Sequence, residues 1–156
     1  MPLYSFFFPS DNLVRGLRPG ELGPYEIQSS TSSLGTTTYS AVPAGANVIA
    51  ASNLEYRFAL SHGVQGTTFF DAGSGLLLPN WLGPTRPSII SSTNGLLHGS
   101  TGLELSWKLP VAGVPVRVNY SFNVLRLNRA FLMPDSSIFR MHDRLGALGW
   151  GLGPLF

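Results

Sequence analysis

The segment Asn53-Leu54-Glu55-Tyr56-Arg57-Phe58-Ala59-Leu60 carries the clearest signal of secondary structure in this chain. Its large apolar side chains recur at every second position from Leu54 to Leu60, and Glu55 and Arg57 fall between them. Successive side chains point to opposite faces in a β-strand, so this period of two is typical of a strand. The stretch therefore predicts a strand with one apolar face and one polar face.

Four further stretches show a similar alternation and predict four more strands of roughly ten residues each. They are residues 65–73, 100–109, 114–124 and 144–156. Short turns at 61–63 and 111–113 predict two hairpins. Longer loops are expected at residues 74–94 and 128–140, and the first third of the chain is expected to be irregular.

The composition excludes several classes of protein. Of 156 residues, 44% are hydrophobic and only 12% are charged, whereas about 25% are charged in a typical soluble chain. No apolar run approaches the roughly 18 residues of a membrane-spanning helix. The net charge of +2 is spread without a basic block, which argues against nucleic acid as a partner. The absence of cysteine excludes a disulfide framework and a thiol nucleophile.

The length of the predicted strands favours a membrane. About 9–11 tilted residues cross a bilayer, whereas strands of soluble proteins most often have five or six. The polar face would line a wet interior, and the apolar face would meet lipid. The residues proposed for the polar face are Glu55, Arg57, Glu104, Lys108, Arg117 and Asn119. We therefore expect an all-β chain that forms part of a transmembrane β-barrel, with a soluble sandwich as the alternative.

A segment near the start of the chain resembles a motif of a known family. Leu13-Val14-Arg15-Gly16-Leu17, followed by Glu21-Leu22-Gly23-Pro24, is similar to the conserved loop of the BamA-type outer-membrane protein assembly family (bacterial surface antigen barrels). Leu17 replaces the aromatic residue that is usual there. Segments 53–58, 69–73, 100–120 and 150–156 resemble later strands of that family, in the family's order.

The resemblance implies how the chain is organised. Residues 1–156 would be the C-terminal part of a larger β-barrel, either as a fragment or as a truncated relative. Residues 1–45 would contain the end of a strand and the long loop that folds into the barrel. Residues 46–156 would contain the last five antiparallel strands.

The resemblance also implies a role for the loop motif, formed by Val14, Arg15, Gly16, Leu17, Gly23 and Pro24. Arg15 would sit at the loop tip inside the barrel and pair with Glu55 and Asp71. The polar-face position of Glu55 agrees with this. A guanidinium can meet two carboxylates in a fork, so the pair would anchor the loop. The alternative is that Arg15 is a solvated residue in an ordinary turn.

The last predicted strand is rich in glycine. Gly149, Gly151 and Gly153 alternate with Trp150 and Leu152, and a strand with so few side chains on one face packs weakly. The resemblance implies that this strand, ending at Phe156, borders a seam whose edge templates the strands of client proteins. The alternative is a small-residue inner face beside the inserted loop.

The sequence offers little for catalysis. It contains no nucleophile elbow, phosphate-binding loop or zinc-protease helix motif. His62, His98 and His142 are far apart, so we expect no metal site and no cofactor. The chain is not expected to be an enzyme.

The function implied by the resemblance is insertion of β-barrels into an outer membrane, bacterial rather than organellar, although mitochondria and chloroplasts keep related barrels. Its partners would be the lipid bilayer, nascent β-barrel client proteins and other subunits of the assembly complex. A two-partner-secretion transporter or pore, which shares the loop motif, is the first alternative. A soluble all-β binding module is the second.

Overall fold

The computed structural model describes residues 13–18, 20–78, 88–108 and 114–153. Within them the chain forms nine strands and one short 3-10 turn, η1 (Ser91–Thr93), and the strands make three antiparallel sheets. The prediction of an all-β fold is confirmed. In this part of the chain, no helix is long and apolar enough to cross a membrane.

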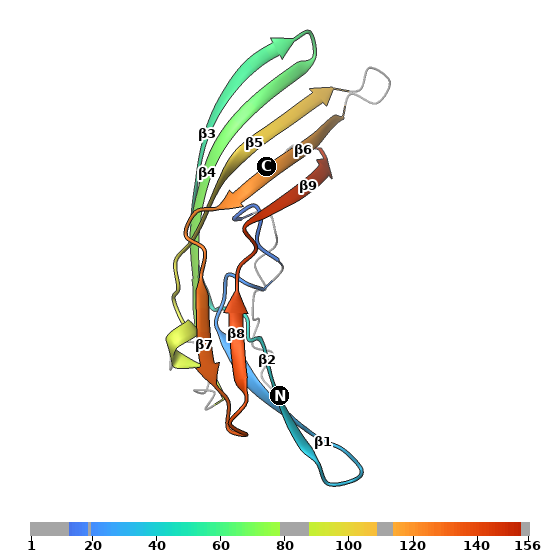
Figure 1. The fold of residues 1–156 in the computed structure, drawn as a ribbon. Helices are drawn as coiled ribbons and strands as arrows, with labels where there is room; N and C mark the ends of the chain where they lie inside the picture. Colours follow the sequence, from blue (N-terminus) through green and yellow to red (C-terminus); the bar gives the residue numbers. More distant parts are fainter. Residues whose placement is uncertain (1–12, 19, 79–87, 109–113, 154–156) are drawn as a thin grey trace.

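The main sheet has five strands in the order β3-β4-β5-β6-β9, and its neighbouring strands are all antiparallel (Figure 1). Their bounds are β3 (Val48–Ser61), β4 (Val64–Leu76), β5 (His98–Lys108), β6 (Pro115–Asn123) and β9 (Gly146–Leu152). The five strands expected from alternation correspond to these five. β3 begins before its predicted start at residue 53 and β4 ends after its predicted end at residue 73, whereas β9 is shorter than the predicted stretch 144–156, whose last three residues lie outside the described part.

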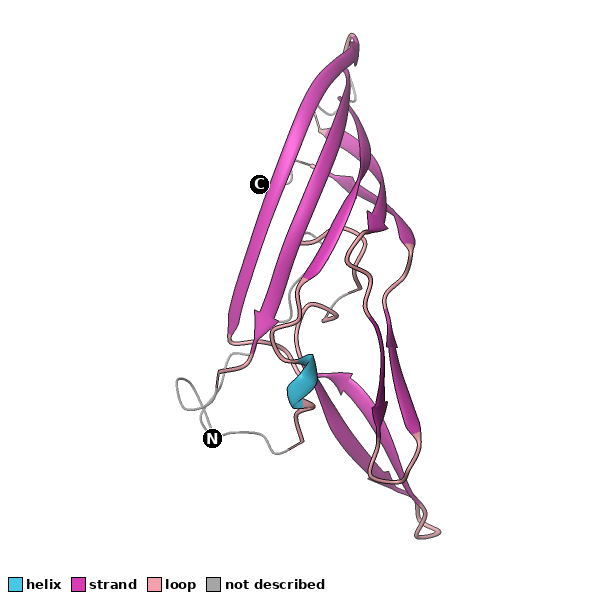
Figure 2. Ribbon diagram, turned by 60° about the vertical axis from the view of Figure 1, so that its left-hand side comes forward, coloured by secondary structure: helices cyan, strands magenta, loops and turns pink. Residues whose placement is uncertain are grey.

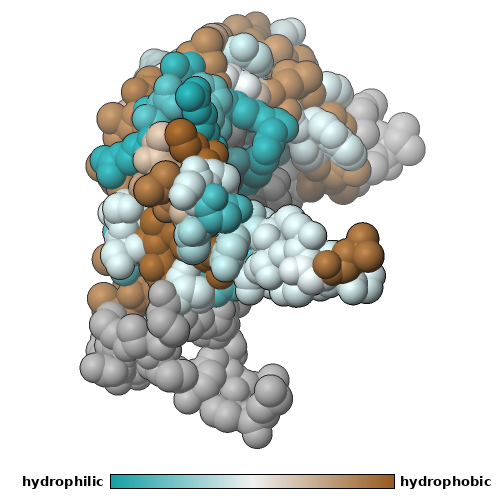
Figure 3. All heavy atoms as spheres, turned by 60° about the horizontal axis from the view of Figure 1, so that its bottom comes forward, coloured by the Kyte–Doolittle hydropathy of each residue, from teal (hydrophilic) through white to brown (hydrophobic). Residues whose placement is uncertain are grey.

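The two faces of the main sheet differ in character, as the alternation predicts. Leu54 and Trp150 are 72% and 78% exposed on the outer face, while Asp71 and Glu104 are buried beneath the loop on the inner face. The other exposed outer-face residues include Tyr56, Leu60, Phe70, Leu103, Leu105, Tyr120, Phe122, Leu148 and Leu152. Figure 3 shows hydrophobic residues along the outer rim and hydrophilic residues next to the hollow. A contiguous exposed apolar surface of this kind is typical of a face that meets lipid or a partner.

Two hairpins extend from one end of the main sheet (Figure 2). The first is β1 (Tyr25–Thr31) with β2 (Thr37–Pro43), and the second is β7 (Asn128–Leu132) with β8 (Ile138–His142). The expectations of an irregular first third and of a loop over 128–140 were wrong, because each of these regions contains a hairpin. The division of the chain near residue 45 stays a prediction.

An aromatic contact between Tyr25 of β1 and Phe139 of β8 joins the two hairpins. The ring centroid of Phe139 lies 5.6 Å from that of Tyr25, and within its own hairpin it lies 6.2 Å from that of its partner Phe131. The backbone of β1 also bonds to the connection between β4 and β5, since the Tyr25 amide donates to Thr93 Oγ1 at 2.9 Å. The two hairpins and the connection between β4 and β5 therefore form one cluster at this end of the sheet.

Candidate functional site

The loop before β1 lies against the inner face of the main sheet. Its residues Val14, Leu17 and Leu22 are buried together, with Leu13 and Ile49 packed beside them. Glycines of β4 allow this close approach: a Cβ on Gly73 would lie 2.7 Å from Val14 Cγ2. Because Gly73 has no side chain, the loop can pack directly against the main sheet.

Gly16 fixes the turn at the loop tip. Its φ of +91° falls in the region that favours glycine. A Cβ at this position would also overlap Ser121 Oγ of β6. The Gly16 carbonyl accepts a hydrogen bond from Asn123 Nδ2 at 3.4 Å. Both the backbone conformation and the available space therefore require glycine.

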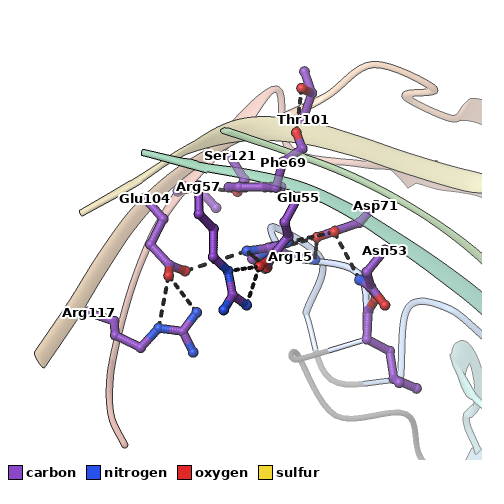
Figure 4. Close-up of polar contacts among 12 residues, drawn as sticks. Arg15, Asn53, Glu55, Arg57, Phe69, Asp71, Thr101, Glu104, Arg117 and Ser121 are labelled. Atoms are coloured by element: carbon purple, nitrogen blue, oxygen red, sulfur yellow. Dashed lines mark hydrogen bonds and ion pairs between the residues drawn. The ribbon is translucent and has the colours of Figure 1, made fainter. Parts of the chain in front are cut away.

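Arg15 binds Asp71 of β4 through its side chain and its backbone (Figure 4). Nε donates to Oδ2 at 2.7 Å, Nη2 donates to Oδ1 at 2.8 Å, and the backbone amide donates to Oδ2 at 3.1 Å. Arg15 is 5% exposed and Asp71 is fully buried. The side-chain pair has the fork geometry that makes arginine–carboxylate contacts strong and directional.

Two further carboxylates and an aromatic ring surround the same guanidinium. Nη1 lies 3.0 Å from Glu55 Oε1 and 3.5 Å from Glu104 Oε2. Cζ lies 3.6 Å from the centroid of the Phe69 ring, which is within the range of a cation–π contact. Arg15 therefore contacts side chains from β3, β4 and β5.

Neighbouring residues extend this cluster into a network. Arg57 Nε donates to Glu55 Oε2 at 2.8 Å, and Arg117 Nε donates to Glu104 Oε1 at 2.9 Å. In Figure 4 both arginines lie on the same side of Arg15, and Asp71 lies on the other side. The network comprises Arg15, Arg57, Arg117, Glu55, Asp71 and Glu104, so three positive charges face three negative charges.

The carboxylates keep Arg15 charged. Burial opposes the charged form, but the hydrogen bonds and attraction from Asp71, followed by the attraction of Glu55 and Glu104, outweigh it and raise the pKa of Arg15 above its usual value. The anchor is therefore insensitive to pH on the arginine side.

The structure thus brings Arg15, Glu55 and Asp71 together, as the family resemblance implied, and adds Glu104. Glu104 was assigned to the polar face, but nothing in the sequence places it beside Arg15. That neighbourhood depends on the register of β4 with β5, which pairs Thr67 with Glu104. The alternation within two strands that are distant in the sequence does not indicate which of their residues pair.

The remaining motif residues lie along the base of the loop. Leu17 is buried in the small apolar core of the loop, where the family usually has an aromatic ring. A Cβ on Gly23 would lie 3.3 Å from the carbonyl carbon of Gly45, and the carbonyl of the buried Pro24 accepts from the Ala44 amide at 2.8 Å. These contacts hold the loop base against the segment that leads into β3.

The glycine-rich strand β9 forms one edge of the main sheet. Within the described residues it pairs only with β6. A Cβ on Gly149 would crowd the Asn119 side chain, whereas a Cβ on Gly151 would have no heavy atom within 4 Å. Gly153 has a φ of +98° just after the strand ends. Phe156 lies outside the described residues.

A cavity of about 540 Å³ lies on the inner face beside the network. Its charged lining residues are Arg57, Glu104, Lys108 and Arg117. Among the described residues, no group of three or more His, Cys, Asp or Glu could hold a metal ion. The chemistry that this arrangement supports is the anchoring of a loop by ion pairs.

The family of the chain follows from comparison with known proteins. The model of the Omp85 superfamily domain matches residues 1–129. The chain therefore belongs to the Omp85 superfamily, whose members are outer-membrane proteins and include both insertion factors and transporters. No curated protein and no solved structure matches the chain. The match ends within β7, so β8 and β9 lie beyond the matched residues.

Proposed function

We propose that the chain acts as a BamA-type assembly factor, which inserts β-barrel proteins into an outer membrane by templating their strands at the edge of β9. No covalent chemistry is involved. The partners are the bilayer, the nascent client barrel and other subunits of an assembly complex. Membership of the Omp85 superfamily supports the proposal at the level of the family.

The observation that carries the proposal is the light packing of the β9 edge. The strand has seven residues, and two glycines lie on its inner face. The open space around Gly151 means that no neighbouring side chain holds that position. An edge strand with unpaired backbone groups can add a strand from another chain through main-chain hydrogen bonds.

The anchored loop supports the same proposal because the strands that it binds differ from the edge strand β9. Every charged residue that contacts Arg15 lies on β3, β4 or β5. Arg117 extends the network to β6. Within the described residues the network has no member in β9. Buried ion pairs therefore stiffen the part of the sheet formed by β3 to β6, and none of them holds the edge strand β9 in place.

The test is a client-insertion assay. The full chain is refolded into lipid vesicles, a denatured client barrel is added, and its folding is followed by heat-modified gel mobility. We expect faster client folding than in empty vesicles. Gly151→Val should slow it several-fold because a β-branched residue stiffens the edge strand. Ala50→Val adds the same class of side chain on β3 and should leave the rate unchanged.

Two results would decide against the proposal. Client folding at the rate of empty vesicles would exclude insertion activity. Selective passage of one partner protein across the vesicle membrane, without client insertion, would favour the two-partner-secretion transporter instead. The polar, charged inner face is the feature that supports this second function.

A further inference from the structure

Four arginines lie in the connection between β6 and β9, immediately beyond the apolar outer face. Arg126 directly follows the exposed pair Val124 and Leu125, and Arg144 directly precedes the exposed Leu145. Arg129 and Arg140 follow on the strands of the second hairpin. All four arginines are exposed. We refer to them as the arginine belt.

Pairing at the base of the hairpin brings two members of the belt, Arg126 and Arg144, side by side. The amide of Leu127 donates to Asp143 Oδ2, and the amide of Asp143 donates to the carbonyl of Leu127, both at 3.0 Å. Arg126 and Arg144, which flank this pair, are therefore neighbours on adjacent segments. Arg129 pairs with Met141 and Arg140 with Ala130, so these two arginines lie close along the hairpin but project from its opposite faces.

Within the described residues, no carboxylate forms an ion pair with the belt. The segment 124–145 contains two carboxylates, Asp135 and Asp143. Asp143 is buried and faces His98 Nδ1 at 3.3 Å, while Asp135 bonds to Ser137 within the hairpin turn. In the described part of the chain, none of the four arginines has an ion pair or side-chain hydrogen bond. Such a cluster of like charges without partners is complementary to an anionic surface.

We infer that the arginine belt binds phosphate-bearing anionic lipid headgroups in the leaflet on the hairpin side of the membrane. A guanidinium binds a phosphate through two parallel N–H bonds. The adjacent apolar residues, Leu97, Val124, Leu125 and Leu145, place the lipid chains directly beside the belt. The order of an apolar band followed at once by cations matches the order of acyl chain and phosphate in a lipid. The inference rests on membrane residence and not on client insertion.

The experiment compares two lipids at the belt. The chain has no cysteine, so Leu97→Cys provides a single labelling site for a fluorophore at the edge of the apolar band. The labelled full chain is refolded into phosphatidylcholine vesicles that contain a minority of phosphatidylglycerol. Quenching by spin-labelled phosphatidylglycerol is then compared with quenching by spin-labelled phosphatidylcholine, at low and at high salt.

We expect the anionic lipid to be favoured by about three- to tenfold at low salt. Because salt screens charges on a surface, the preference should fall towards unity at about 1 M salt. The variant R126Q/R144Q should lose most of the preference. The control R18Q/K108Q removes the same charge away from the belt and should retain the preference.

Each outcome has a definite meaning. Equal quenching by both lipids in the parent chain overturns the inference, as does a preference that persists in R126Q/R144Q. Heat-modified mobility shows whether the variants have folded. If the double variant does not fold, R126Q and R144Q are measured singly, and an undiminished preference in both also overturns it. Client insertion is measured separately, so the loss of lipid preference can be distinguished from failure of the proposed function.

Discussion

Arg15 and Asp71 are joined by three hydrogen bonds, one of which comes from the Arg15 backbone amide. The backbone bond fixes the position of the loop relative to β4, and the two side-chain bonds fix the plane of the guanidinium. Because Asp71 is fully buried, it has no access to water that could replace these donors. The pair is therefore the centre of the loop anchor.

Arg15→Ala should release the loop from the sheet. Removal of one partner from a buried ion pair typically costs about 3–5 kcal/mol, because the other charge is left without compensation. The loss should be seen as faster proteolysis within residues 13–24 and as unfolding at a lower denaturant concentration in lipid.

Arg18→Ala is the matched control for that experiment. Arg18 is 58% exposed, and its Nε lies 3.9 Å from Glu21. Such surface pairs contribute roughly 0–1 kcal/mol. Equal sensitivity of the two variants to protease and denaturant would contradict a central role for Arg15.

Gly16→Ala should displace the loop tip from β6. The alanine adds backbone strain at positive φ, about 1–2 kcal/mol, and its Cβ also overlaps Ser121 Oγ. Gly35→Ala separates these two effects because Gly35 has a φ of +80° but no heavy atom near its would-be Cβ. Denaturant unfolding should show the larger loss for Gly16→Ala, and equal losses would show that the contact with Ser121 is unimportant.

Acid should weaken the base of the second hairpin through Asp143, which lies between β8 and β9. Burial raises the pKa of Asp143, but the contact with His98, the Leu127 amide and the charges of His98 and His142 outweigh it and leave the pKa below its usual value of 3.8. A lowered pKa contributes stability above the usual value, and this is lost as the pH falls through the folded-state value. Hydrogen exchange of residues 124–145 should therefore accelerate below about pH 4, after correction for intrinsic rates. In Asp143→Asn this acceleration should be absent, and its persistence there would exclude Asp143 as the cause.

Phe139→Ala should separate the two hairpins and expose Tyr25. Burial, with smaller contributions from Glu21 and Asp143, raises the pKa of Tyr25 to about 12. Loss of the Phe139 ring exposes the phenol, so the pKa should fall towards 10.0. A spectrophotometric titration, taken as the difference from Tyr25→Phe, measures it. An unchanged titration would mean that Phe139 does not shield Tyr25.

The sequence predicts the main sheet well because its strands separate an apolar surface from a polar one. In β3, every second side chain from Leu54 to Leu60 is apolar, so the period of two is visible without the structure. The hairpin β1–β2 lacks this signal, since its strands consist largely of Ser, Thr and other small or polar residues. A hairpin whose residues are exposed or half-buried on both faces need not alternate.

The inner site could be predicted only in part, for a related reason. Glu55 and Asp71 could be associated with Arg15 through the family resemblance. The approach of Glu104 depends on which residues of β4 and β5 face each other. The aromatic contact of Arg15 with Phe69 depends in addition on the depth of the loop. Both contacts of Arg15 depend on the assembled sheet, so the sequence of a single segment does not predict them.

The anchor of the loop also sets an order of events during folding. Arg15 is separated along the chain by 56 residues from Asp71, by 89 from Glu104, and Gly16 by 107 from Asn123. Contacts over such separations form only after the chain between them has been organised, because each closure costs conformational entropy. The carboxylates come into position only when β3, β4 and β5 have paired in register. Docking of Arg15 is therefore a late step in folding that requires correct strand pairing. If the register of the main sheet slipped, Arg15 would lack its carboxylate partners.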